Sequence, residues 1–152
     1  MIRNIAFFIA LMATALALGG ALAHALELPN KIGLPADQYF TVQQAYSGWN
    51  RLSLLLLVEL LSMIALAWLY WGEPRVRWPV LASIGCLVVA QIIFWSFTFP
   101  ANQRTSNWTA IPDDWEHLRR SWEFSHAAGA AFQCLALAAL IVAVLSRRSP
   151  SE

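Results

Sequence analysis

Glutamate and histidine stand three residues apart at two places in this chain, and both pairs adjoin long apolar segments. Glu123 and His126 form an E-x-x-H pair, and His24 with Glu27 forms the reversed pair. Residues three apart on a helix share one face, so each pair presents a carboxylate and an imidazole together. Such pairs bind metal ions in helical bundles, and they also act as general acids and bases.

Each pair belongs to a longer stripe along its own segment. On the last apolar segment the stripe members are spaced 4, 3, 4 and 3 residues apart: Arg119, Glu123, His126, Ala130 and Gln133. The first segment repeats this spacing: Ala13, Ala17, Gly20, His24 and Glu27. At about 100° per residue each set stays on one helical face. Ionisable groups in hydrocarbon seek protein partners, so both stripes are predicted to face the interior of a bundle.

The two middle segments carry one polar residue each at a similar depth. Glu59 stands eight residues below Arg51, about 12 Å of helical rise, and Gln91 stands nine below Pro100, about 13 Å. All four segments are therefore predicted to contribute to one polar pocket. A carboxylate at the depth of Glu59 is costly unless it is paired or protonated, which favours a functional role for it.

The segments that position these groups read as membrane spans. The chain has 152 residues, of which 59% are hydrophobic and 12% charged. Four stretches match the ~20 apolar residues that a span needs, at about 5–26, 52–71, 79–99 and 121–145. The last helix should extend from about Asp114 to about Ser146, beyond the bilayer. A net charge of +1 gives no field for a polyanion, so nucleic acid is excluded as a partner.

The first stretch has two interpretations. A basic start, an apolar middle and small residues in an A-x-A arrangement are typical of a cleaved secretory signal. The apolar run, residues 5–23, is longer than the ~7–15 residues of a signal's hydrophobic region, which favours a retained span.

Arginine density sets the expected orientation. With the amino terminus inside, the inner segments 1–4, 72–78 and 147–152 hold five arginines in 17 residues. The outer segments 28–51 and 101–120 hold five basic residues in 44. The denser side faces the cytoplasm, so both termini are predicted to be cytoplasmic, with outer loops at 28–50 and 101–118. We expect an integral protein of a bacterial cytoplasmic membrane.

Three kinds of chemistry fit the polar pocket. His24, Glu27, Glu123 and His126 are candidate ligands for a metal ion, or the two histidines for a haem, although a di-iron site would lack an acid on the third span. Without a cofactor, Glu123 and His126 would act as a general acid/base pair on a bound apolar molecule, with Glu59 as a partner. In the third interpretation the same groups serve only as polar contacts between helices.

Two stretches near the carboxyl end resemble a known family. A third span ending in "FPANQRTSNW", followed by "DDWEHLRRSWEFSHAAGA" and a last apolar helix, is similar to the four-span membrane family that includes the anthrone oxygenases. The resemblance rests on Asn102, Arg119, Trp122 and the polar residue His126. It implies a four-helix membrane fold and insertion of an oxygen atom from dioxygen into an electron-rich aromatic carbon.

These observations together predict one all-α transmembrane domain over residues 1–152, a four-helix bundle. The expected function is an oxygenase-like or redox enzyme for a small apolar, aromatic molecule, with Glu123, His126, Glu59, Arg119 and Asn102 as the site. A metal ion, a haem or no cofactor all stay open. The alternative is a non-enzymatic module that binds a partner protein or lipid through its outer loops.

Overall fold

The computed structural model describes residues 1–147, and within them all regular structure is helical. Its α-helices are α1 (Ile2–Lys31), α2 (Ala36–Gln43), α3 (Leu52–Leu69), α4 (Pro74–Ile93), α5 (Phe99–Arg104) and α6 (Trp115–Leu145). Short 3₁₀ turns η1 (Gln44–Tyr46) and η2 (Trp49–Arg51) follow α2, and a π-helical segment, η3 (Phe94–Thr98), joins α4 to α5. The all-α prediction is confirmed.

Four of these helical stretches are long and apolar enough to cross a membrane: Ile2–Lys31, Trp49–Leu69, Pro74–Arg104 and Trp115–Leu145. Many of their apolar side chains are exposed, including Phe8, Leu54 and Trp68. Apolar side chains directed outward along a whole helix are expected where the surrounding solvent is lipid. The four spans therefore form an integral membrane bundle.

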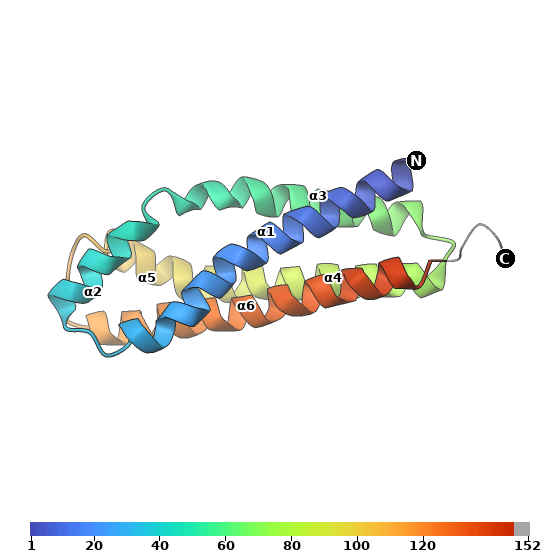
Figure 1. Cartoon of the computed structure of the whole chain (residues 1–152). Coiled ribbons are helices and arrows are strands. Elements are labelled where there is room, and N and C mark those ends of the chain that lie inside the picture. The colour runs from blue at the N-terminus through green and yellow to red at the C-terminus, as the bar shows by residue number, and fades with distance from the viewer. Residues whose placement is uncertain (148–152) are drawn as a thin grey trace.

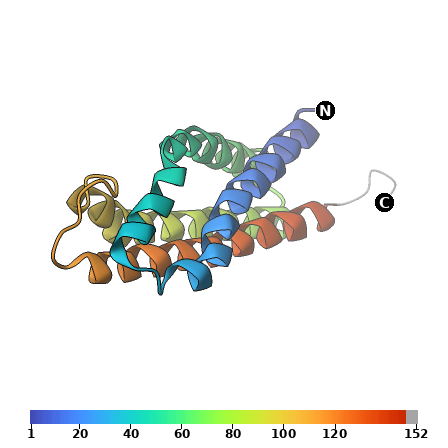
Figure 2. The same ribbon diagram turned by 60° about the vertical axis from the view of Figure 1, so that its left-hand side comes forward.

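The four spans form an uneven bundle (Figures 1 and 2). Helix α6 packs along both α4 and α1, and α1 also packs along α3, whereas α3 and α4 meet over a shorter length. Helices α2 and α5 lie together at one end, here called the outer end (Figure 1). The start of α1 and the end of α6 lie at the opposite, inner end, as an even number of spans requires.

Polar contacts hold the inner end together. Arg3 Nη1 lies 2.7 Å from Glu73 Oε1 in the α3–α4 loop, and Arg147 Nη1 donates to Asn4 Oδ1 at 2.9 Å. An apolar core fills the inner half, with Phe7, Met63 and Leu140 among its buried members. The core of the outer end is instead mainly aromatic: Tyr39, Phe40, Ala101, Trp108, Leu118 and Trp122.

Two helix boundaries differ from the prediction. Helix α1 continues through Pro29 to Lys31, although the first span was expected to end near residue 26 and an outer loop to begin at residue 28. Because the helix continues, the Lys31 ammonium reaches the buried Glu123 carboxylate on α6. This contact favours the longer helix, whereas proline by itself disfavours a position inside a helix. The third span is also longer than 79–99, because Pro74 begins the helix and α5 extends it to Arg104, inside the expected outer loop.

Candidate functional site

Both predicted stripes face the bundle interior, with one exception. On α6, Arg119, Glu123, Ala130 and Gln133 are buried and His126 is half-buried. On α1, His24 is buried, but the Glu27 side chain keeps 48% of its exposure. Glu27 therefore lies at the rim of the site, in contrast to the prediction for this stripe.

The histidines of the two stripes meet. The ring centroids of His24 and His126 lie 4.4 Å apart, although α1 and α6 are the first and last helices of the chain. Aromatic rings surround them: Tyr46, Trp49 and Trp122 have centroids 4.4, 5.1 and 5.0 Å from that of His24. The pair thus sits in an aromatic shell, away from the carboxylates that adjoin it in sequence.

The hydrogen bonds of the two imidazoles define what each can offer. His126 Nδ1 lies 2.9 Å from the Trp122 carbonyl oxygen. A carbonyl only accepts, so Nδ1 carries the proton, and Nε2 of the neutral ring presents a lone pair. His24 is 7% exposed, and its Nδ1 is buried without a hydrogen-bond partner in residues 1–147. This pair therefore has unused hydrogen-bonding capacity within an apolar enclosure.

Lys31 also belongs to the candidate site, although the sequence predicted it to lie in the outer loop. Its Nζ lies 3.2 Å from Glu123 Oε1 and donates to the Tyr46 hydroxyl at 2.7 Å. The Tyr46 hydroxyl in turn donates to Glu27 Oε2. Spacing offered a signal, because Lys31 follows His24 by seven residues and Glu27 by four, which places it on the same helical face.

Helix α2 covers this network from outside. The Tyr39 hydroxyl donates to Glu123 Oε1 at 2.9 Å and accepts a hydrogen bond from Gln43 Nε2 at 2.6 Å. Burial raises the pKa of Tyr39 above its usual value, and the nearby Glu123 carboxylate raises it further. The phenol consequently keeps its proton and remains a donor. Glu123 is thus tied to α1 through Lys31 and to α2 through Tyr39.

Arg119 and Asn102 connect the outer segments to α6. Arg119 Nη1 donates to the Leu34 carbonyl at 2.7 Å, which holds the turn between α1 and α2. Asn102 Oδ1 accepts indole N–H groups from both Trp108 and Trp122, each at 2.9 Å. Both residues therefore organise the cover of the site rather than contact the histidine rings.

Glu59 lies in a second polar layer, closer to the inner end. Gln133 Nε2 donates to Glu59 Oε1, while Glu59 Oε2 and the buried Thr14 hydroxyl have no hydrogen-bond partner among the described residues. Gln133 follows His126 by seven residues, so the layers are separated by about 10 Å of helical rise. Glu59 is the middle residue of the 49–69 span.

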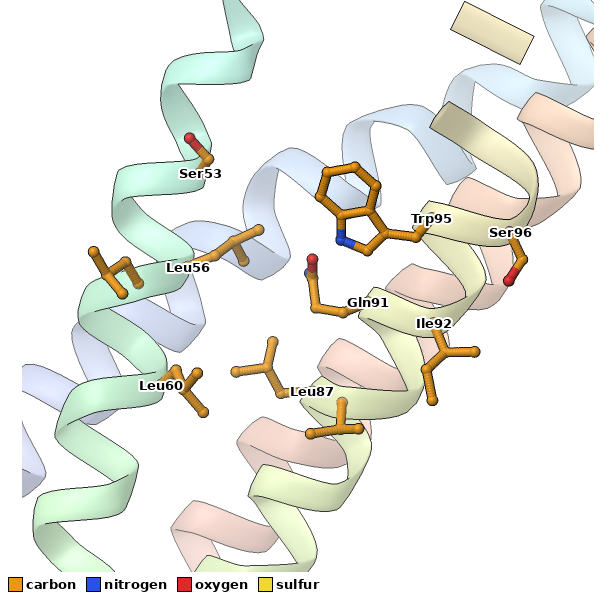
Figure 3. A pocket seen from close by; sticks show the side chains of 10 residues that line it. Ser53, Leu56, Leu60, Leu87, Gln91, Ile92, Trp95 and Ser96 are labelled. Carbon is orange, nitrogen blue, oxygen red and sulfur yellow. The ribbon is translucent and has the colours of Figure 1, made fainter. Parts of the chain in front are cut away.

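Gln91 joins neither layer. Its side chain points into a groove between α3 and α4 (Figure 3). The expectation of a single pocket to which all four spans contribute is therefore wrong: α1 and α6 form the histidine site, and α3 and α6, with Thr14 of α1, form the Glu59 layer.

The metal and haem expectations gain no support from this geometry. No group of three or more His, Cys, Asp or Glu side chains within residues 1–147 is arranged to hold a metal ion. Glu27 and Glu123 are engaged by Lys31 and the tyrosines instead of by the histidines. Two imidazoles on opposite sides of one iron would have centroids roughly 6 Å apart, since each metal–nitrogen bond is about 2 Å. The observed 4.4 Å leaves no room for a haem.

Comparison with protein-family models, with curated proteins and with solved structures finds no match to this chain. The fold and the site define the class of this chain: a four-span, all-α membrane protein with a histidine pair under its outer cover.

Proposed function

We propose that this chain is a membrane enzyme that oxidises a small, apolar aromatic molecule with dioxygen, using the histidine pair as its base. One observation carries the proposal: His24 and His126 meet at 4.4 Å inside an aromatic shell, with His126 Nδ1 bonded to a carbonyl and Nε2 left free. An imidazole lone pair in an apolar site is suited to removing a proton from an activated carbon.

The chemistry needs no metal. A methylene flanked by aromatic rings and conjugated with a ketone loses a proton to the imidazole, and the resulting carbanion reduces dioxygen. One oxygen atom becomes a new carbonyl and the other leaves as water, so R₂CH₂ and O₂ give R₂C=O and H₂O. The aromatic rings of Tyr46, Trp49 and Trp122 supply flat apolar surfaces for such a substrate. The sequence resemblance to the anthrone oxygenase family supports the same class of reaction.

The test measures oxygen uptake by the full-length protein in lipid nanodiscs supplied with anthrone. We expect uptake above that of empty nanodiscs, with formation of the quinone. His126→Ala should lower kcat by about 10²–10⁴-fold, the range for loss of a general base. His117→Ala, an exposed residue on the same helix, is the matched control and should retain full activity. A parent protein no faster than empty nanodiscs, or a fully active His126→Ala, would contradict the proposal.

The alternative function is a non-enzymatic module that binds a partner protein or lipid through the outer segments 28–50 and 101–118. The internal pairing of Glu123 with Lys31 and Tyr39 favours it, because these contacts hold α2 in place. This alternative predicts that the His24→Ala/His126→Ala variant retains partner binding and that no reduced aromatic substrate increases oxygen uptake.

A further inference from the structure

A groove between α3 and α4 is not used by the proposed reaction. Its volume is about 610 Å³, and its walls are mainly leucine, valine and isoleucine side chains. The groove exists because α3 and α4 meet over a shorter length than the other neighbouring spans. Several of its lining residues are well exposed at the bundle surface, among them Leu57, Val88 and Ile92. The groove therefore opens sideways, toward lipid.

Gln91 and Trp95 place polar groups within this apolar lining, whose other polar residues are Ser53 and Ser96. The Gln91 side chain extends from α4 into the groove, and the indole of Trp95 lies above it with the nitrogen-bearing edge turned toward it (Figure 3). No described residue forms a hydrogen bond with the Gln91 amide. A polar group without a partner in hydrocarbon costs free energy, so this position favours an occupant that supplies one.

The backbone is specialised at the same place. Trp95 and Ser96 belong to η3, the π-helical segment, and both line the groove. The opposite side of η3 is held to α6 by the hydrogen bond between Thr98 and Ser125 at 2.6 Å. A π-helix bonds i to i+5, which widens the turn and changes the residues that face a given side, and such segments often mark functional sites. Trp95 lies on this wider turn and faces the groove.

Depth restricts the occupant. Gln91 lies two residues from residue 89, the middle of the 74–104 span, or about 3 Å of helical rise. Measured instead from Pro100, it lies nine residues, about 13 Å, below the outer end. The hydrocarbon layer is about 30 Å thick, so the ester carbonyls of bilayer lipids stay roughly 15 Å from its centre and do not reach Gln91.

We propose that this groove binds a lipid-soluble carbonyl compound with an apolar tail, which enters from the bilayer and places its carbonyl oxygen against the Gln91 amide and the Trp95 indole. The Gln91 NH₂ group and the Trp95 indole N–H donate hydrogen bonds, so an oxygen acceptor complements them, while the carbonyl oxygen of the Gln91 amide is itself an acceptor. The apolar tail lies along the Leu56 and Leu60 side of α3. This binding site is separate from the histidine pair and requires no turnover.

Photocrosslinking tests the proposal in the full-length protein. The probe is 4-decylbenzophenone, whose ketone is both the acceptor and the photoreactive group, in lipid nanodiscs. Its comparison is a decyl diazirine that has no carbonyl. Mass spectrometry then locates the modified residues. We expect saturable capture of the benzophenone on groove residues of α3, α4 and η3.

Three variants distinguish the effect of the Gln91 hydrogen bond on probe capture from the effect of the space in the groove. Gln91→Leu keeps the groove apolar and should lower benzophenone capture roughly five- to tenfold, the value of one hydrogen bond, without changing diazirine capture. Val88→Trp, at an exposed groove position, should lower capture of both probes by filling the space. Val142→Trp, at an exposed position on α6, is the matched control and should change neither. Equal benzophenone capture by the parent and Gln91→Leu, or crosslinks spread evenly over all four spans, would overturn the proposal.

Discussion

The Lys31 ammonium lies 3.2 Å from Glu123 Oε1, and the two side chains retain only 4% and 0% of their exposure. This ion pair joins the last turn of α1 to α6 beneath the α2 cover. A buried charge is tolerated only when it is paired, so each partner determines how the other can be placed. Lys31 Nζ also lies 5.0 Å from the ring centroid of Trp122, and the same ring packs against His24.

Removing one member of this pair should be costly. Lys31→Met leaves the Glu123 carboxylate buried without its cation, and we expect a loss of about 3–5 kcal/mol in the free energy of unfolding in detergent micelles. Lys31→Met/Glu123→Gln should recover much of this loss, which makes the two effects non-additive.

The ion pair between Arg104 and Asp114 serves as the control, because its side chains are 59% and 36% exposed. Breaking it with Arg104→Ala should cost about 0–1 kcal/mol. If Lys31→Met proves as mild as Arg104→Ala, the buried pair does not stabilise the packing of α1 against α6.

The tyrosines of the outer cover should resist ionisation. Burial raises the pKa of Tyr39 and Tyr46 above the usual value of about 10, and the carboxylates Glu123 and Glu27, respectively, raise them further. A pKa raised by folding means that the native state binds the proton more tightly. The stability gained is complete below about pH 10 and is lost as the pH rises toward the native pKa.

An alkaline titration followed by phenolate absorbance tests this. At about pH 11, the native protein and the Tyr39→Phe/Tyr46→Phe variant should show equal absorbance, since the two replaced phenols are still protonated. The unfolded chains should differ by two phenolates. A difference of two phenolates already present in the native proteins would disprove the shift.

Asn102 should be important for the outer aromatic core. Its Oδ1 accepts the indole N–H groups of Trp108 and Trp122, both 4% exposed. Asn102→Ala leaves both donors unpaired, at about 1–3 kcal/mol each, whereas Asn102→Asp keeps an acceptor and should cost less. Unfolding free energy and tryptophan fluorescence measure the effect. Asn50→Ala, at an exposed position, should stay within about 0.5 kcal/mol, and a similarly small effect of Asn102→Ala would refute the role.

Gly20 should limit the distance between α1 and α3. A Cβ built at Gly20 would lie 3.3 Å from Leu52 Cδ1, whereas one at Gly19 meets nothing within 4 Å. Gly20→Val should therefore overpack the contact and cost about 1–3 kcal/mol of unfolding free energy. Gly19→Val tests helix propensity alone and should be close to neutral or slightly stabilising. Equal effects at the two glycines would show that the helices do not approach closely at Gly20.

Periodicity in the sequence was sufficient for the helices and for most of their buried faces. The spacing of the α6 stripe correctly separated buried Glu123 and Gln133 from exposed His117 and Arg120. The spacing was informative because a polar side chain on a membrane helix is costly when it faces lipid and therefore faces the protein interior. Periodicity does not predict the distance between helices. It could not show that the Gln91 side chain points into a groove between α3 and α4 instead of lying beside Glu59.

Apolar length and helical periodicity were enough to predict an all-α chain with four apolar spans and to place His24 and His126 on interior faces, because polar groups on a membrane helix are buried on one helical face. The partner of each buried polar group depends instead on how the helices pack in three dimensions. Lys31 reaches Glu123 only because α1 continues past Pro29 and packs on α6, and that pairing leaves the histidines facing each other without the carboxylates. Local propensity could not reveal this outcome, since the free energy of pairing a buried charge depends on residues 92 positions apart in the sequence.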